Sequence, residues 1–398
     1  MKLKIKLVSV ILCSFWSVIS CMGASQKPLS AADFHSLNGT SRLQSKAKFL
    51  SEKKGTIVFL GGSITHMKGW SEQVQQHIRE QFPQADLTFL KAGIPSLGSV
   101  PHAFRFQQDV LDKGVPDLLF IEAAVNDRGN GYALVDQQRA LEGIIRRVKQ
   151  LNPKVDLVMM HFADPDKLKD YARHEIPTVI KNHNEVAAYY HIPVVNLAKE
   201  VYARIENKEF EWERDIKNLH PSPFGQKLYA QSIDGLIDTL LAGTNETSSA
   251  IRSLPAPLHT DSYTTARYGD VKEATGTFTY VPCYDATGQP TREGFTHVPM
   301  LIGEKAGQQL SYTFTGNAIG LCVISGKDAG ILEYSLDGGP YQTKELFTQW
   351  SASLHLPWYV MLASGLTYKT HTLKVRIAST HHQKSVGHAC RIVHFLIN

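Results

Sequence analysis

The chain has 398 residues, of which 43% are hydrophobic and 20% charged, and a formal net charge of +5 with histidine neutral. This length predicts two or three domains, and the composition excludes a disordered or fibrous protein. The small excess of positive charge is spread thinly along the chain, without a dense stripe of lysine and arginine among aromatic residues. The sequence therefore predicts no nucleic-acid partner.

Residues 1–24 are predicted to be a signal peptide. A lysine-rich start precedes the apolar run Leu7–Ile19, which is too short to span a bilayer and is typical of a signal-peptide core. Val18–Cys21 resembles a bacterial lipobox, whose cysteine is lipidated, and ordinary cleavage near Ala24 is the alternative. We therefore expect an exported protein, either periplasmic or anchored to the outer membrane through Cys21, and this anchor is the one membrane contact that the sequence predicts.

Residues 25–245 alternate between apolar runs and amphipathic stretches. The predicted strands are Thr56–Leu60, Leu87–Leu90, Leu118–Ile121, Leu157–Met160 and Ile192–Asn196. The predicted helices are Gln73–Gln81, Phe104–Leu111, Gln137–Leu151, Val179–Tyr190 and a last one that ends at about Leu241. Uninterrupted apolar strands indicate burial on both faces, and their alternation with helices indicates a doubly wound α/β domain with a parallel sheet. Ligands of such sheets bind at the carboxyl ends of the strands.

Residues 246–257 are predicted to be a linker, because the stretch is rich in small and polar residues and proline. Between residues 258 and 398, short alternating segments such as Gln309–Phe314 and Leu373–Ile377 are separated by turn signals such as Asp337–Pro340. This pattern predicts an all-β sandwich, with either a carbohydrate-binding or a structural role.

Polar residues and glycines follow the first three predicted strands. Ser63 stands in a Gly-Gly-Ser-Ile-Thr segment directly after the first strand, where the glycines allow a sharp turn that exposes the hydroxyl; a helix-capping serine is the alternative. Gly98 lies in the loop after the second strand, and Asn126 lies in a Val-Asn-Asp segment after the third. The backbone N–H groups of Ser63 and Gly98 and the Asn126 amide can form an oxyanion hole. Taken singly, Gly98 also fits a turn, and Asn126 fits a loop cap.

His220 lies in a Leu-His-Pro segment just before the last predicted helix, where Pro221 and Pro223 restrict the backbone. Histidine suits the transfer of a serine proton to a leaving group near neutral pH. Asp215, five residues earlier, is the predicted group that orients the imidazole. The sequence thus predicts Ser63 as nucleophile, His220 as base and Asp215 as the acid of a triad.

Together these segments resemble the four sequence blocks of the SGNH (GDSL-like) hydrolase family, which occur here in order between Thr56 and Leu241. The resemblance implies a three-layer α/β/α domain and a serine-ester mechanism without a metal or any other cofactor.

Two positions depart from the family pattern. Lys217 stands where the family often has its acid, which leaves Glu213 or a backbone carbonyl as alternatives to Asp215. Lys91 replaces the usual asparagine of the second block, so the donor glycine of that block can be displaced from Gly98.

The segments Met160–Asp166 and Leu354–Tyr359 resemble an exported, Bacteroidetes-type subgroup of this family that carries a C-terminal β-sandwich. This resemblance implies a carbohydrate esterase whose partner is an acylated glycan, chiefly one with O-acetyl groups. Aromatic and basic side chains near the predicted mouth suit sugar rings and uronate carboxylates. The candidates for substrate contact are His66, Trp70, His102, Arg105 and Arg128.

Three functions are compatible with the sequence. The first is removal of O-acyl groups, above all acetyl, from a polysaccharide or oligosaccharide through an acyl-enzyme on Ser63. The second is a lipid esterase or lysophospholipase with the same catalytic groups, and the third is a non-catalytic glycan-binding protein. The polar loops favour the first over the second, and the presence of all four blocks favours it over the third.

Overall fold

The α/β domain of the computed structural model is built around a six-stranded sheet with the strand order β1-β6-β5-β4-β2-β3. The structure describes residues 28–243, 253–286, 289–292 and 294–398, so the predicted signal peptide and Cys21 lie outside the described residues. The strands are β1 (His35–Ser36), β2 (Lys54–Gly61), β3 (Asp86–Gly93), β4 (Leu118–Glu122), β5 (Asp156–Met160) and β6 (Val194–Val195). Strands β2 to β6 pair in parallel as predicted, whereas the short edge strand β1 runs antiparallel to β6.

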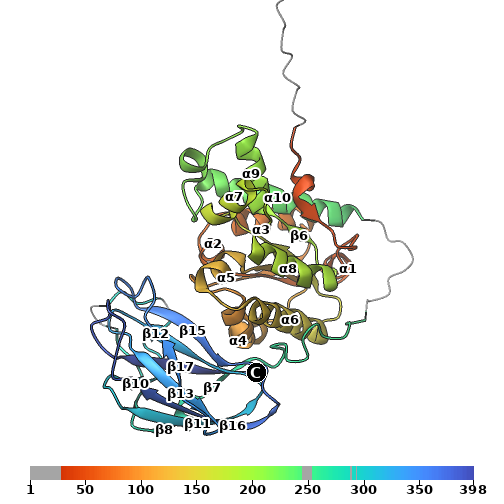
Figure 1. Cartoon of the computed structure of the whole chain (residues 1–398). Helices are drawn as coiled ribbons and strands as arrows, with labels where there is room; N and C mark the ends of the chain where they lie inside the picture. Colours follow the sequence, from red (N-terminus) through yellow and green to blue (C-terminus); the bar gives the residue numbers. More distant parts are fainter. Residues whose placement is uncertain (1–27, 244–252, 287–288, 293) are drawn as a thin grey trace, which may run out of the picture.

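Successive residues of the central strands enter two separate cores, which is the reason for the three layers. In β2, Val58 and Leu60 join the core shared with α4, α6 and α8, whereas Ile57 and Phe59 join the core on the opposite face with α3, α9 and α10. Full burial of each such side chain contributes roughly 1.5–3 kcal/mol. Figure 1 shows α4, α6 and α8 on the side of the sheet that faces the second domain. The predicted three-layer fold is therefore confirmed.

Ten α-helices of this domain lie within the described residues. They are α1 (Ser45–Ser51), α2 (Ser63–His66), α3 (Trp70–Gln81), α4 (Ser99–Asp109), α5 (Ala124–Asn130), α6 (Leu134–Leu151), α7 (Pro165–Ala172), α8 (Thr178–Tyr189), α9 (Leu197–Glu206) and α10 (Pro223–Ala242). Several begin earlier than their apolar pattern predicted, such as α3 at Trp70 instead of Gln73 and α4 at Ser99 instead of Phe104. None of the helices in the described ranges is both long and apolar enough to cross a bilayer.

The C-terminal region consists of two antiparallel sheets, as predicted. One has the order β15-β12-β17-β10-β9 with β7 added to β17, and the other has the order β14-β13-β16-β11-β8. The strands are β7 (Arg267–Gly269), β8 (Thr275–Gly276), β9 (Thr279–Val281), β10 (Met300–Gly303), β11 (Gln309–Gly316), β12 (Ile319–Ser325), β13 (Ile331–Leu336), β14 (Gln342–Glu345), β15 (Leu356–Ala363), β16 (Lys369–Ile377) and β17 (Cys390–Ile397). A third apolar core fills the space between these sheets.

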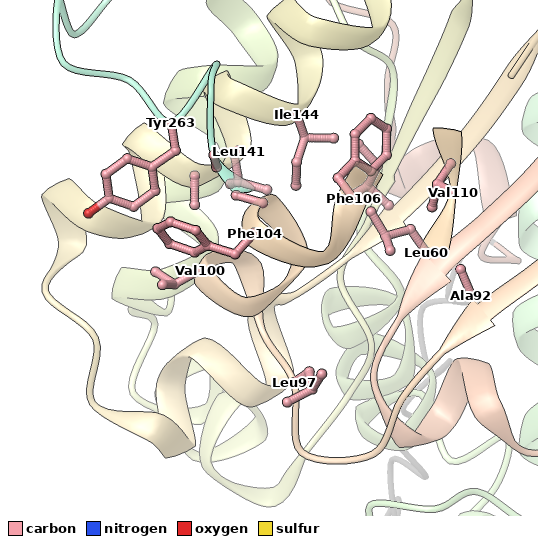
Figure 2. Packing of buried hydrophobic residues seen from close by; sticks show 14 of the residues in the cluster. Leu60, Ala92, Leu97, Val100, Phe104, Phe106, Val110, Leu141, Ile144 and Tyr263 are labelled. Atoms are coloured by element: carbon pink, nitrogen blue, oxygen red, sulfur yellow. The ribbon is translucent and has the colours of Figure 1, made fainter. Parts of the chain in front are cut away.

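The two domains share one of their cores. Strand β12 is buried along its whole length, because Leu321 and Val323 face the interior of the sandwich while Cys322 and Ile324 join the core around α4 and α6. Figure 2 shows the ring of Tyr263 beside Phe104 and Leu141, and the ring centroids of Phe104 and Tyr263 are 5.3 Å apart.

Polar contacts fix the same junction. The hydroxyl of Tyr132 donates to the carbonyl of Tyr359 at 3.0 Å, and Arg139 pairs with Asp261 at 2.5 Å. The buried carboxylate of Glu142 accepts from the backbone N–H groups that follow the predicted linker. Part of the linker predicted at 246–257 lies outside the described residues, and its remainder runs along the α/β domain, where Arg146 donates to the carbonyl of Pro255 at 2.7 Å.

Candidate active site

The predicted site residues meet at the carboxyl edge of the central strands. Ser63 is the first residue of α2, directly after β2, and Asn126 lies in α5, which follows β4. Gly98 precedes α4 at the end of the loop that follows β3, and His220 lies in the loop before α10. Figure 1 shows α2 and α5 close together at this edge of the sheet.

Ser63 and His220 are in direct contact. The hydroxyl oxygen of Ser63 lies 2.8 Å from Nε2 of His220, although 157 residues separate them in the chain. Gly62 is the N-cap residue of α2, so the hydroxyl of Ser63 is not needed as a cap. A side chain at Gly62 would place its Cβ 2.1 Å from the Asn126 amide nitrogen, so only glycine allows this close approach. The structure thus excludes the capping alternative for Ser63.

The His220 imidazole is held at the surface by its own loop. Its backbone N–H donates to the side-chain oxygen of Asn218 at 2.7 Å, and the N–H of Ser222 donates to the carbonyl of Ile216 at 3.0 Å. Partial burial, and secondly the positive charge of Arg292, lower the pKa of His220 below its ordinary value. A lowered pKa keeps the imidazole neutral at neutral pH, which is the form that can accept the serine proton.

The structure does not support Asp215 as the third member of a triad. Its carboxylate accepts from the backbone N–H of Glu211 at 2.8 Å and from the guanidinium of Arg214 at 2.7 Å. Hydrogen bonding from Arg214 and then from Glu211 lowers the pKa of Asp215, so this carboxylate is ionised but turned to another partner. Within the described ranges, the hydrogen bond of the His220 ring is the one to Ser63. Glu213, the weaker candidate, is exposed.

The predicted oxyanion donors lie beside the nucleophile. One N–H of the Asn126 amide donates to the carbonyl of Leu97 at 3.0 Å, which leaves its second N–H for another acceptor. Both Asn126 and the carbonyl of Leu97 approach the position that a side chain on Gly62 would occupy. Gly98, the residue after Leu97, occupies the N-cap position of α4, so its N–H group is at the positive end of that helix. The arrangement can stabilise negative charge on an oxygen next to Ser63.

Three of the five predicted substrate contacts are buried in this structure, which does not support them as surface contacts. Trp70, His102 and Arg105 are buried, with 0%, 0% and 1% exposure. The indole N–H of Trp70 donates to the carbonyl of Ile64 at 3.2 Å, and the Arg105 guanidinium donates to the carbonyl of Ala92 at 2.5 Å. The latter two lie on α4 and turn towards the ends of the strands, because His102 Nε2 lies 3.3 Å from the carbonyl of Glu122 and Arg105 bonds the carbonyl of Ala92. The local helical pattern gave no sign of this orientation.

The other two predicted contacts are at the surface. The exposed ring of His66 lies at the end of α2 with Nδ1 3.1 Å from the carbonyl of Gly93, which places it at the rim near Ser63. Arg128 is exposed on α5, but its guanidinium is paired with Asp170, so its charge is already partly neutralised. Of the five predicted residues, His66 therefore has the position most suited to contact with a substrate bound at Ser63.

Sequence reasoning missed two residues that bear on the site. Asp127 follows Asn126 in the Val-Asn-Asp segment and is almost fully buried. Its place beside a predicted oxyanion donor was therefore visible in the sequence. Arg292 belongs to the C-terminal domain, and only the packing of the two domains brings its charge close enough to affect His220. No group of three or more potential metal ligands occurs among the residues that the structure describes.

This geometry is that of an acylhydrolase domain with a serine–histidine pair and an oxyanion site. Residues 59–228 match the model of the GDSL-like Lipase/Acylhydrolase family, so the N-terminal domain is a GDSL-like acylhydrolase domain. No match was found among curated protein sequences.

Two solved structures resemble the chain over both of its domains. They are of a two-domain esterase (CEX) active on acetylated mannans, one of them co-crystallised with mannopentaose. The TM-score is 0.72 for the mannopentaose co-crystal and 0.73 for the other structure, and the sequence identity is 22% for both. Each alignment covers 90% of this chain, together with 96% of the solved chain in the co-crystal and 97% in the other structure. An acetylxylan esterase from Geobacillus stearothermophilus matches 46% of this chain at 16% identity with a TM-score of 0.40.

Proposed function

We propose that this protein is an exported serine esterase that removes O-acetyl groups from a polysaccharide or oligosaccharide. The observation that carries the proposal is the 2.8 Å contact between the Ser63 hydroxyl and His220, flanked by the Asn126 amide. This arrangement, in a GDSL-like acylhydrolase domain, has a nucleophile, a base and an oxyanion donor in one place.

The mechanism follows from these positions. His220 takes the proton of Ser63 as its oxygen attacks the carbonyl carbon of the ester, and the carbonyl oxygen becomes an oxyanion that the Asn126 amide and the N–H groups of Ser63 and Gly98 stabilise. The intermediate collapses when His220 returns the proton to the sugar oxygen, which leaves an acetyl group on Ser63. Water, deprotonated by His220, then attacks this acyl-enzyme and releases acetate.

The domain arrangement supports a glycan substrate. Both mannan esterase structures align with both domains of this chain, and that esterase is active on acetylated mannans. In this chain, a cavity of about 530 Å³ lies between Ile94, in the loop that carries Gly98, and the C-terminal domain. Its lining combines Tyr268, Asp270 and His394 with apolar side chains such as Val271 and Phe295, so it offers both ring and polar contacts to a ligand.

Release of acetate from acetylated polysaccharides tests the proposal. Purified protein should release acetate, measured separately from methanol, from at least one of acetylated mannan, xylan and pectin. Ser63→Ala should abolish this release, whereas Ser51→Ala, at an exposed position on the opposite edge of the sheet, should leave it unchanged. Turnover of long-chain lipid esters in place of acetylated glycans would support the lipid esterase, and glycan binding without turnover would support the non-catalytic alternative.

Export and lipid anchoring are part of the same proposal and rest on the sequence of residues 1–24. Mass spectrometry of the mature N-terminus should find a lipidated Cys21, and Cys21→Ala should move the protein from the membrane fraction to the soluble fraction. An unmodified N-terminus near residue 25 would contradict the anchor but not the export.

A further inference from the structure

Helix α5 holds the loop that carries Gly98 at three points. The amide of Asn126 donates to the carbonyl of Leu97 at 3.0 Å, and the amide of Asn130 donates to the carbonyl of Ser96 at 2.9 Å. Between these two, the carboxylate of Asp127 accepts from the backbone N–H of Ser99 at 2.8 Å. Ser96 has a positive φ of 70°, a conformation that non-glycine residues seldom adopt and that external contacts must hold in place.

The contact of Asp127 with Gly98 is the closest of these. A Cβ on Gly98 would lie 2.1 Å from Oδ1 of Asp127, so this position accepts no side chain. Gly98 has no side chain with which to cap α4, and the carboxylate of Asp127 takes the place of a cap by accepting from the first N–H of the helix. The position of the Gly98 backbone is therefore set directly by Asp127.

The second oxygen of the Asp127 carboxylate is held by a histidine of α8. Nε2 of His183 lies 2.9 Å from Oδ2 of Asp127, and their side chains are 1% and 0% exposed, respectively. A buried carboxylate needs hydrogen bonds to all of its oxygens, so this imidazole N–H both satisfies and orients the carboxylate. The ring of His161, from the segment after β5, packs beside that of His183, with 5.9 Å between the ring centroids.

We propose that Asp127 and His183 are positioning residues of the oxyanion site. Neither touches the reacting atoms: His183 orients Asp127, and Asp127 fixes the loop from which the Gly98 N–H donates. The inference rests on the proposed esterase function and deepens it, because it assigns a task to a residue pair outside the serine, glycine, asparagine and histidine of the site. Loss of the pair should lower the stabilisation of the oxyanion without altering binding of the ester.

The test compares two substitutions of His183. In His183→Gln an amide N–H can still donate to Asp127, whereas the apolar chain of His183→Met has a similar size but cannot. We expect kcat for an activated acetate ester to fall about 100-fold in His183→Met and to recover largely in His183→Gln, since a displacement of about 1 Å in a catalytic geometry costs on the order of 10²-fold. KM should change little in either variant.

A transition-state analogue separates positioning from a structural role. Phenylboronic acid should form a tetrahedral adduct with Ser63, and its inhibition constant should rise by the same factor as kcat falls. As a matched control, Asp156 is a buried carboxylate that accepts the N–H groups of Gln44 and Ser45 at the amino end of β5. Asp156→Asn should lower the melting temperature but leave kcat and the inhibition constant unchanged.

The results distinguish failure of the proposed esterase function from failure of the proposed positioning role. If wild-type protein neither hydrolyses the ester nor binds the boronic acid, the proposed function itself is wrong. If the wild type is active and a folded His183→Met variant retains its kcat, the positioning role is wrong. If His183→Met fails to fold, Asp127→Asn takes its place: a fall in kcat with an unchanged KM supports the role, and an unchanged kcat overturns it.

Discussion

The two domains contribute to the candidate site in different ways. The α/β domain supplies the reacting groups from the ends of adjacent strands, so that Ser63 and Asn126 follow β2 and β4, which pair directly in the sheet. Among its described residues, the C-terminal domain supplies no reacting group, yet its Arg292 lowers the pKa of His220, and its strands bury one face of α4. The difference shows that sheet topology brings the reacting groups together, whereas packing of the second domain alters the pKa of His220 and buries part of α4.

The largest expected effect concerns the shared core. Tyr263 is 1% exposed, lies beside Phe104, and donates its hydroxyl to Asp136 at 2.8 Å. Tyr263→Ala should cost about 3–5 kcal/mol of stability, as is typical for a large buried aromatic side chain. Calorimetry should give a single transition for the wild type, because the domains share a core. Two separate transitions in the wild type would show that the domains unfold independently.

The next effect concerns the oxyanion site. Asn126→Ala removes one donor to the developing negative charge and should lower kcat by about 10²–10³-fold, or about 2.7–4 kcal/mol of transition-state stabilisation. Steady-state kinetics with an activated acetate ester measure this change. Since the effect belongs to the transition state, KM should stay near the wild-type value; a rise in KM with kcat unchanged would assign Asn126 to substrate binding instead.

A smaller effect should reveal the influence of the C-terminal domain on the site. The charge of Arg292 lowers the pKa of His220, so Arg292→Gln should raise that pKa. The imidazole must be neutral to act as base, and a higher pKa therefore requires a higher pH for full activity. We expect the acid limb of the pH profile of kcat/KM to move upward in Arg292→Gln. Lys305→Gln, on the same domain, is the charge-matched control and should leave the profile unchanged. A profile of Arg292→Gln identical to that of the wild type would show that Arg292 does not affect the pKa of His220.

The smallest effect should come from Asp215. Its carboxylate is paired with Arg214 and is not bonded to the imidazole of His220. Asp215→Asn should therefore change kcat less than threefold, whereas loss of a true triad acid lowers kcat by about 10⁴-fold. A loss of that size would mean that Asp215 turns towards His220 during the reaction.

The sequence predicted the fold and the central pair because these depend on local pattern. Apolar strands such as Leu118–Ile121 must be buried on both faces, and the segments around Ser63 and His220 stand at the ends of predicted elements. Parallel strand order then brings these ends together.

What the sequence did not predict depends on long-range packing. The helical pattern around His102 and Arg105 did not show that both side chains turn towards strand-end carbonyls of the sheet, so both were predicted to contact the substrate although they are buried. In the same way, the short distance in sequence between Asp215 and His220 does not determine the direction of the carboxylate. That direction is set by the short π-helix Trp212–Ile216 and by the ion pair with Arg214.

The central claim is that Ser63 is the nucleophile, and covalent labelling tests it most directly. After treatment with a fluorophosphonate, peptide mapping by mass spectrometry should find one adduct, on the peptide that contains Ser63, in proportion to the loss of esterase activity. Ser63→Ala should remain unlabelled. An adduct on another residue, or an active protein that remains unlabelled at Ser63, would contradict the account.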